Sequence, residues 1–98
     1  MQQEKATADQ LSQFLLENLL WSIKENKLYR EFIFCDFAMA FEFMTQAAKF
    51  FESLNHHPEW SNSYNKVTVN LITHESDGIS NKDFRLAKKM SSIADHLT

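Results

Sequence analysis

The chain has 98 residues, 44% of them hydrophobic, which is enough for one compact domain over residues 1–98 and too few for two. The formal net charge of −3 argues against direct binding to nucleic acid, because such binding depends on clustered Lys and Arg. The single cysteine, Cys35, excludes an internal disulfide and any Cys-rich zinc module.

The N-terminal residues MQQEKATADQ are polar and lack the apolar run of a signal peptide, and no stretch reaches the length of a membrane span. We therefore expect a soluble, cytoplasmic protein with a flexible tail over residues 1–6. Thr7-Ala8-Asp9-Gln10 has the spacing of a capping box, and Leu11, Phe14 and Leu15 follow at helical intervals. This pattern predicts a first helix from about residue 8 to 18.

Two β-like runs come next. Trp21 and Ile23 alternate with polar residues up to Glu25-Asn26, and the run KLYREFIFC over 27–35 reads as a second strand. The short polar connection between the runs predicts a hairpin.

A long helix is predicted over residues 37–54, with Asp36 as its N-cap. This helix is apolar on two sides, so it needs two surfaces to bury it: the sheet and either a second subunit or other elements of the same chain. One stripe contains Phe37, Phe41, Met44, Ala48 and Phe51, and the other contains Met39, Phe43, Ala47, Phe50 and Leu54.

The clearest strand is predicted over residues 63–74, with Val67, Val69 and Leu71 facing the helices. After Gly78, the only glycine, Ser80-Asn81-Lys82-Asp83 has the pattern of a second helix start. The last helix has an apolar stripe of Phe84, Ala87, Met90, Ala94 and Leu97. The predicted fold is α+β in the order α-β-β-α-β-α, with an antiparallel sheet of three to four strands and three helices packed on one face.

Three of the four histidines fall at the ends of predicted elements, where functional groups are often displayed. His56 and His57 follow the long helix, and His74 ends the predicted strand. Pro58 favours an extended conformation at His57, which directs neighbouring side chains to different sides. Imidazole exchanges protons near neutral pH, so the arrangement suits general acid–base chemistry, for example the elimination of water.

Other interpretations of these residues remain open. Adjacent loop histidines are often surface residues, and three histidines are also compatible with a zinc site, although no H-x-x-x-H spacing is present. Asp83 is placed to cap a helix, and Trp60 suits packing as well as ligand binding. Glu52 stands in the last turn of a helix, where the helix dipole disfavours a carboxylate, which favours a role in binding a ligand.

Taken together, Glu52, His56-His57-Pro58, Tyr64, His74 and Asp83, at their spacings, resemble the signature of the pterin-4a-carbinolamine dehydratases. The resemblance extends from about Leu11 to Ala94. One departure, Leu20 before Trp21 where related chains often have glycine, lies outside the signature and affects only the turn before the first strand.

The resemblance implies an enzyme that removes water from a 4a-hydroxytetrahydropterin, such as 4a-hydroxytetrahydrobiopterin, giving the quinonoid dihydropterin that a reductase recycles. It implies neither a metal nor a redox cofactor. By analogy, His56, His57 and His74 form the acid–base set. The implied substrate-binding residues are Glu52, Pro58, Trp60, Thr73, Glu75, Ser76 and Asp83.

The same family implies a second function. Its animal members also act as a dimerisation cofactor of a homeodomain transcription factor, through the helical surface that otherwise joins two dimers into a tetramer. The two apolar stripes over residues 37–54 are compatible with a homotetramer or with a transcription-factor helix as partner, and the second case would also place the protein in the nucleus.

Overall fold

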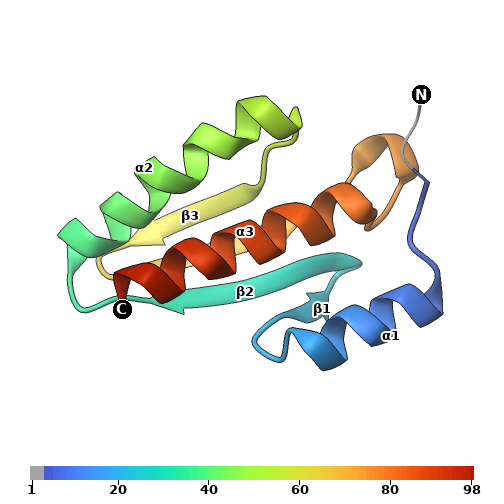
Figure 1. Cartoon of the computed structure of the whole chain (residues 1–98), viewed down its shortest axis with the longest axis horizontal. Coiled ribbons are helices and arrows are strands. Elements are labelled where there is room, and N and C mark those ends of the chain that lie inside the picture. Colours follow the sequence, from blue (N-terminus) through green and yellow to red (C-terminus); the bar gives the residue numbers. More distant parts are fainter. Residues whose placement is uncertain (1–3) are drawn as a thin grey trace.

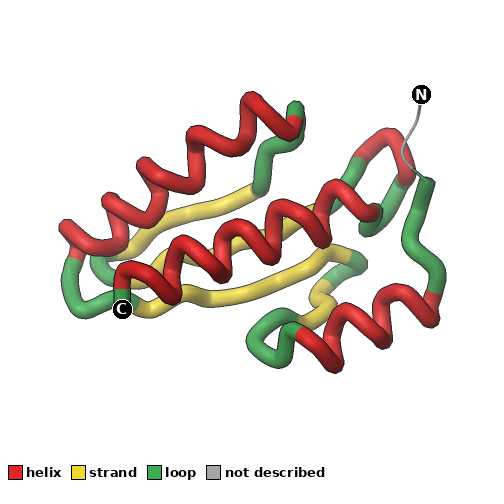
Figure 2. Tube along the Cα trace, in the orientation of Figure 1, coloured by secondary structure: helices red, strands yellow, loops and turns green. Residues whose placement is uncertain are grey.

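The computed structural model describes residues 4–98. The elements are α1 (Ala8–Glu17), β1 (Ser22–Lys24), β2 (Lys27–Ile33), α2 (Phe37–Leu54), β3 (Glu59–Ser63), β4 (Lys66–Leu71), the short 3-10 helix η1 (His74–Ser76) and α3 (Asn81–Leu97). The strands form one antiparallel sheet in the order β1-β2-β4-β3. Helices α2 and α3 run antiparallel across one face of this sheet, and α1 lies at the end near β1 (Figures 1 and 2). The predicted α+β class is therefore confirmed. None of the described helices is both long and apolar enough to cross a membrane.

Strand β3 is absent from the predicted order, and the structure corrects this to α-β-β-α-β-β-α. The segment predicted as one strand over 63–74 contains the β3–β4 turn, strand β4 and the start of η1. The β3 sequence EWSNS is rich in Ser and Asn, which have low strand propensity, so its signal is weak. Pairing with β4, from Glu59 opposite Asn70 to Ser63 opposite Lys66, fixes it as an edge strand.

The first hairpin is confirmed. Glu25 and Asn26 connect β1 to β2, and both have positive φ angles, of 51° and 64°. Two successive left-handed residues are the mark of a type I′ turn, whose twist matches that of paired strands. Strand β2 ends at Ile33, two residues before the predicted end.

The core lies between the sheet and helices α2 and α3. Val67, Val69 and Leu71 point inward from β4 and have no exposed surface, as their alternation predicts. Each large apolar side chain buried in this way contributes about 1.5–3 kcal/mol to the free energy of folding. Facing them are Phe43 and Ala47 of α2 and Leu86, Ala87 and Met90 of α3.

Helix α2 begins where predicted, because the Asp36 side chain accepts a hydrogen bond from the N–H of Met39. Its two predicted stripes are rearranged in the structure. The buried face combines Ala40, Phe43, Ala47 and Phe51, which recur at steps of three and four residues. Phe37 and Phe41 lie outside this face and are 47% and 56% exposed.

Residues 5 and 6, which the sequence placed in a flexible tail over residues 1–6, are paired with another part of the chain. Residues 1–3 lie outside the described part of the chain, but Lys5 forms an isolated antiparallel bridge with Ser80, and the N–H of Ala6 donates to the carbonyl of Ile79 at 2.7 Å. The predicted capping box of Thr7 and Gln10 then starts α1. The polar sequence gave no sign of this pairing, because a single bridge involves only backbone groups.

Candidate active site

The way in which α2 ends places His56 and His57 in different surroundings. Asn55 adopts the left-handed conformation (φ 52°, ψ 46°), and the N–H groups of Asn55 and His56 donate to the carbonyls of Glu52 and Phe51. Beyond this cap His56 turns inward and is 9% exposed, whereas the His57 side chain is 59% exposed. The two imidazoles therefore point to different sides, His56 into the protein and His57 toward solvent.

A buried polar network connects His56 to two other elements. Its Nε2 atom lies 2.5 Å from Oδ1 of Asp83, in the first turn of α3. The other oxygen of Asp83, Oδ2, accepts hydrogen bonds from Thr73 Oγ1 at 2.8 Å and from the N–H of Ser80 at 2.9 Å. The Thr73 and Ser80 hydroxyls lie 2.6 Å apart. This network joins the end of α2, the segment after β4 and the start of α3.

Asp83 has the predicted role in a capping box, which is formed with Ser80. Asp83 also contacts the side chains of His56 and Thr73, which its capping pattern did not predict. The side chain is fully buried, and a carboxylate without water needs hydrogen-bond donors to offset the cost of its desolvation. Thr73, Ser80 and His56 provide them.

His74 begins η1, and β4 ends three residues earlier at Leu71, which corrects the prediction that His74 ends a strand. The backbone of Thr73 pairs with Gly78 in both directions, and this closes the turn that carries His74. The His74 side chain is 77% exposed, and its Nε2 lies 3.5 Å from Oε2 of Glu59.

Sequence reasoning missed Glu59 and its partner Lys27. Lys27 Nζ donates to Glu59 Oε1 at 2.6 Å, and this hydrogen bond is the main reason why the pKa of Glu59 is lowered. The charge of Lys27 and contacts with His74 act in the same direction. The pair could have been found only from the pairing of β2 and β3 with the two edges of β4. That pairing cannot be predicted before β3 is recognised as a strand.

His57 lies over the last turn of α2. Its Nε2 is 3.9 Å from Oε1 of Glu52, whose side chain is 88% exposed. The Phe51 ring meets the edges of both His57 and Trp60, at centroid distances of 5.8 and 5.0 Å. Trp60 is half-buried in this position.

The structure thus groups the predicted site residues in two sets. His56, Thr73 and Asp83 meet in the buried network, while the exposed histidines His57 and His74 each face a carboxylate of their own. Of the remaining residues, Glu75 lies 3.8 Å from Lys82, and the N–H of Ser76 donates to the carbonyl of Thr73. Among residues 4–98, no three His, Cys, Asp or Glu side chains converge in a way that would hold a metal ion.

Comparison with known proteins places this chain in a family. The family model described as Pterin 4 alpha carbinolamine dehydratase matches residues 4–93. Two proteins that carry the pterin-4-alpha-carbinolamine dehydratase name are similar to the chain. The one from Solibacter usitatus is 46% identical over 92% of this chain and 95% of its own, and the one from Rhizobium meliloti is 45% identical over 97% and 93%.

A solved structure shows the same fold. It is described as a transcriptional coactivator/pterin dehydratase from Brucella melitensis, it is 40% identical, and it superposes with a TM-score of 0.89 over 93% of this chain and 99% of that one. The family match, the curated relatives and the shared fold agree over nearly the whole chain. The chain therefore belongs to the pterin 4 alpha carbinolamine dehydratase family.

Proposed function

We propose that the chain dehydrates 4a-hydroxytetrahydropterins, such as 4a-hydroxytetrahydrobiopterin, by histidine acid–base catalysis. In this reaction the bond between C4a and its hydroxyl oxygen breaks, and the hydroxyl leaves as water after it gains a proton. The neighbouring ring nitrogen loses its proton, and the electron pair forms the new C=N bond of the quinonoid dihydropterin. One group must therefore donate a proton and another must accept one.

The observation that carries this proposal is the buried network of His56, Asp83 and Thr73. Hydrogen bonds through Asp83 connect the His56-His57-Pro58 loop to Thr73, the residue before His74, although the two segments are distant in the sequence. His57 and His74 are the accessible proton carriers, because their side chains are 59% and 77% exposed. His56 is held in one orientation by Asp83, and its Nδ1 is the nitrogen that Asp83 does not engage.

The remaining residues have roles around the ring of the substrate. Trp60 offers an apolar wall that Phe51 supports, and the exposed carboxylate of Glu52 is suited to accept hydrogen bonds from pterin N–H groups. Pro58, Glu75 and Ser76 line the same region through the two loops. Thr73 and Asp83 act through His56, because their side chains are committed to the buried network. The product would be returned to the tetrahydropterin by a reductase in the cytoplasm.

The test is the rate at which chemically generated 4a-hydroxytetrahydropterin loses water, followed by ultraviolet absorbance. We expect His57→Ala and His74→Ala to lower kcat by about 10²–10⁴-fold, the range of general acid–base catalysis. We expect His56→Ala to lower kcat as well. His96→Ala is the matched control, because His96 lies in the last turn of α3 and its Nδ1 contacts the carbonyl of Ser92. Absence of any acceleration by folded wild-type protein would refute the proposal.

A second candidate function rests on the exposed part of α2. The Phe37 and Phe41 rings lie 5.7 Å apart and are both about half exposed, which forms an apolar surface that a partner helix or a second copy of this chain would cover. The solved relative from Brucella melitensis is also described as a transcriptional coactivator. We propose that this surface joins subunits into a homotetramer, a dimer of dimers, or alternatively binds the dimerisation helix of a transcription factor.

The two functions separate by mutation. Binding of a transcription-factor dimerisation peptide should survive His74→Ala and be lost in Phe41→Lys. The dehydration rate should fall in His74→Ala and be retained in Phe41→Lys. If the peptide does not bind to the wild-type protein at micromolar concentration, the coactivator function is rejected.

A further inference from the structure

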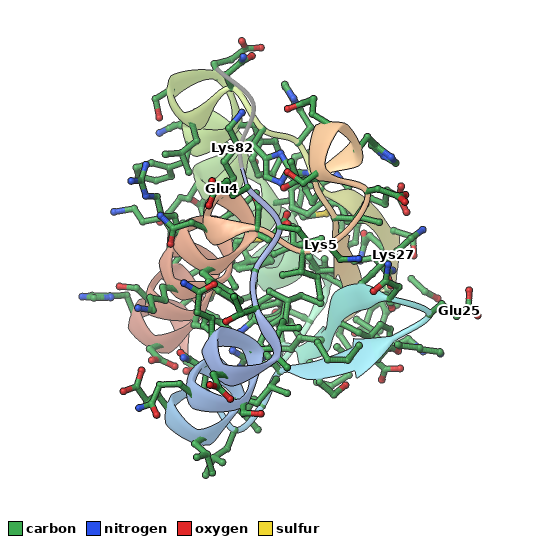
Figure 3. The ribbon with its side chains drawn as sticks, turned by 90° about the vertical axis from the view of Figure 1, so that its right-hand side faces the viewer. Glu4, Lys5, Glu25, Lys27 and Lys82 are labelled. Atoms are coloured by element: carbon green, nitrogen blue, oxygen red, sulfur yellow. The ribbon has the colours of Figure 1, made fainter. Side chains whose placement is uncertain are left out.

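The N-terminal segment Lys5–Thr7 is attached to the chain that leads from η1 into α3. Ala6 donates its N–H to the carbonyl of Ile79 at 2.7 Å, and Lys5 bridges Ser80. Figure 3 looks onto this end of the molecule, where the segment with Glu4 and Lys5 crosses that connection. The segment is therefore paired with residues 79 and 80 through one isolated bridge.

The side chain of Lys5 packs over Gly78. A Cβ atom placed on Gly78 would lie 2.7 Å from Cε of Lys5, closer than Cβ contacts in proteins, and 3.2 Å from its Cδ, which is a tight contact. The methylene groups of Lys5 thus occupy the space that a side chain at position 78 would need, although Lys5 as a whole is exposed.

The residues held in this way carry the buried network of the site. The N–H of Ser80 donates to Asp83 and its hydroxyl contacts Thr73, so the backbone at Ser80 fixes the position of the Asp83 carboxylate. A second attachment lies on the other side of Asp83, where the Phe14 ring of α1 stacks on Phe84 at a centroid distance of 4.6 Å. The N-terminal region therefore fixes both ends of the turn that contains Asp83.

We propose that Lys5 and Ala6 are positioning residues of the active site. By holding the backbone at residues 78–80, they keep Asp83 in the place where one of its oxygens meets Nε2 of His56. With Asp83 ionised, its oxygens only accept hydrogen bonds, so Nε2 of His56 is the donor. Loss of the N-terminal contact loosens this hydrogen bond and lets the imidazole of His56 rotate. The effect on turnover rests on the proposed dehydratase function, but the effect on the His56 N–H does not.

The experiment compares Ala6→Pro, which removes the N–H donated to Ile79, with Ala6→Gly, which retains it. Two quantities are measured: the rate at which the His56 imidazole N–H exchanges with solvent, by ¹⁵N NMR, and kcat with KM in the dehydration assay. We expect Ala6→Pro to accelerate the exchange by about 2–10-fold, the equivalent of one hydrogen bond, and to lower kcat with KM unchanged. Ala6→Gly should behave like the wild type in both measurements.

A second pair of variants tests the side chain of Lys5. Lys5→Ala removes the methylene groups that cover Gly78 and should shift both quantities in the same direction, whereas Lys5→Met keeps an unbranched chain there and should restore them. Urea denaturation checks that each variant is folded, and if Ala6→Pro does not fold, the Lys5 pair decides the question.

The proposal is overturned if folded Ala6→Pro exchanges its His56 N–H at the wild-type rate, whether or not kcat changes. If Ala6→Pro does not fold, the same result with folded Lys5→Ala overturns it. If the wild-type protein shows no turnover, the dehydratase function fails, and the exchange measurement alone still confirms or rejects the positioning role.

Discussion

At the scale of single residues, Asp83 shows how much a local pattern can predict. Its position three residues after Ser80 correctly indicated a capping box, because that role depends only on neighbours in the sequence. The contact with His56 joins residues 27 positions apart. The packing of α2 beside α3 brings them together, so the capping pattern alone did not specify this contact, although the family signature contains both residues.

We expect Asp83→Asn to destabilise the protein by about 1–3 kcal/mol, because the amide replaces one of the two buried acceptor oxygens by a donor, opposite either His56 or Thr73. Urea denaturation would measure the change in the free energy of unfolding. Asp77→Asn makes the same chemical change at an exposed residue with a left-handed backbone that Asn tolerates, and it should have almost no effect. Equal stability of both variants would contradict the structural role of the network.

Glu59 offers a second prediction at this scale. Its pKa is lowered chiefly by the hydrogen bond from Lys27, so Lys27→Met should raise the pKa of Glu59 towards the ordinary value of a glutamate. NMR titration of the Glu59 side-chain carboxyl carbon would detect this. Lys24→Met is the control, because Lys24 lies over the ring of Tyr29. An identical titration in wild type and Lys27→Met would show that the contact is not maintained in solution. The pair is partly exposed, so we expect little change in overall stability.

At the scale of elements, the helices and the first hairpin could be predicted because their signals are local. Caps at Thr7, Asp36 and Ser80 mark the helix starts, and alternation marks the inward face of β4. Strand β3 could not be predicted, because its Ser and Asn residues form a strand only through pairing with β4. The turn between them also lacks glycine, and Tyr64 instead takes a positive φ of 52°.

Tyr64 therefore marks a strained turn. A left-handed backbone costs most residues about 1–2 kcal/mol, and Asn tolerates it better because its short side chain bonds locally. Tyr64 is 65% exposed, so its replacement removes little packing. We expect Tyr64→Asn to raise the free energy of unfolding by about 0.5–1 kcal/mol. Thermal unfolding would measure it against Tyr64→Val, a β-branched residue that is poorly suited to the left-handed region and should destabilise the turn. A Tyr64→Asn variant less stable than wild type would indicate that the ring has a packing role.

At the scale of the whole molecule, the sheet has helices on one face, and α2 keeps part of its apolar surface uncovered. The sequence predicted a helix that is apolar on two sides, and the structure shows that elements of the same chain cover only one of them. The stripes drawn from the sequence mixed buried and exposed residues, because the rotation of α2 about its axis is set by contacts with the sheet and α3. What covers Phe37 and Phe41 depends on a second molecule and lies beyond any pattern in one chain.

If this surface joins subunits, the double variant Phe37→Lys, Phe41→Lys should dissociate the assembly. Each phenylalanine ring buried at such an interface contributes about 1.5–3 kcal/mol, and two lysines brought close to their symmetry copies add repulsion between like charges. Sedimentation velocity at micromolar concentration would then give a smaller species than the wild type. The matched control is Leu16→Lys, Leu19→Lys, which changes two residues near the end of α1 that are 71% and 81% exposed. Dissociation in the control alone would show that the interface involves α1 and not α2. A monomeric wild-type protein would rule out assembly through either surface.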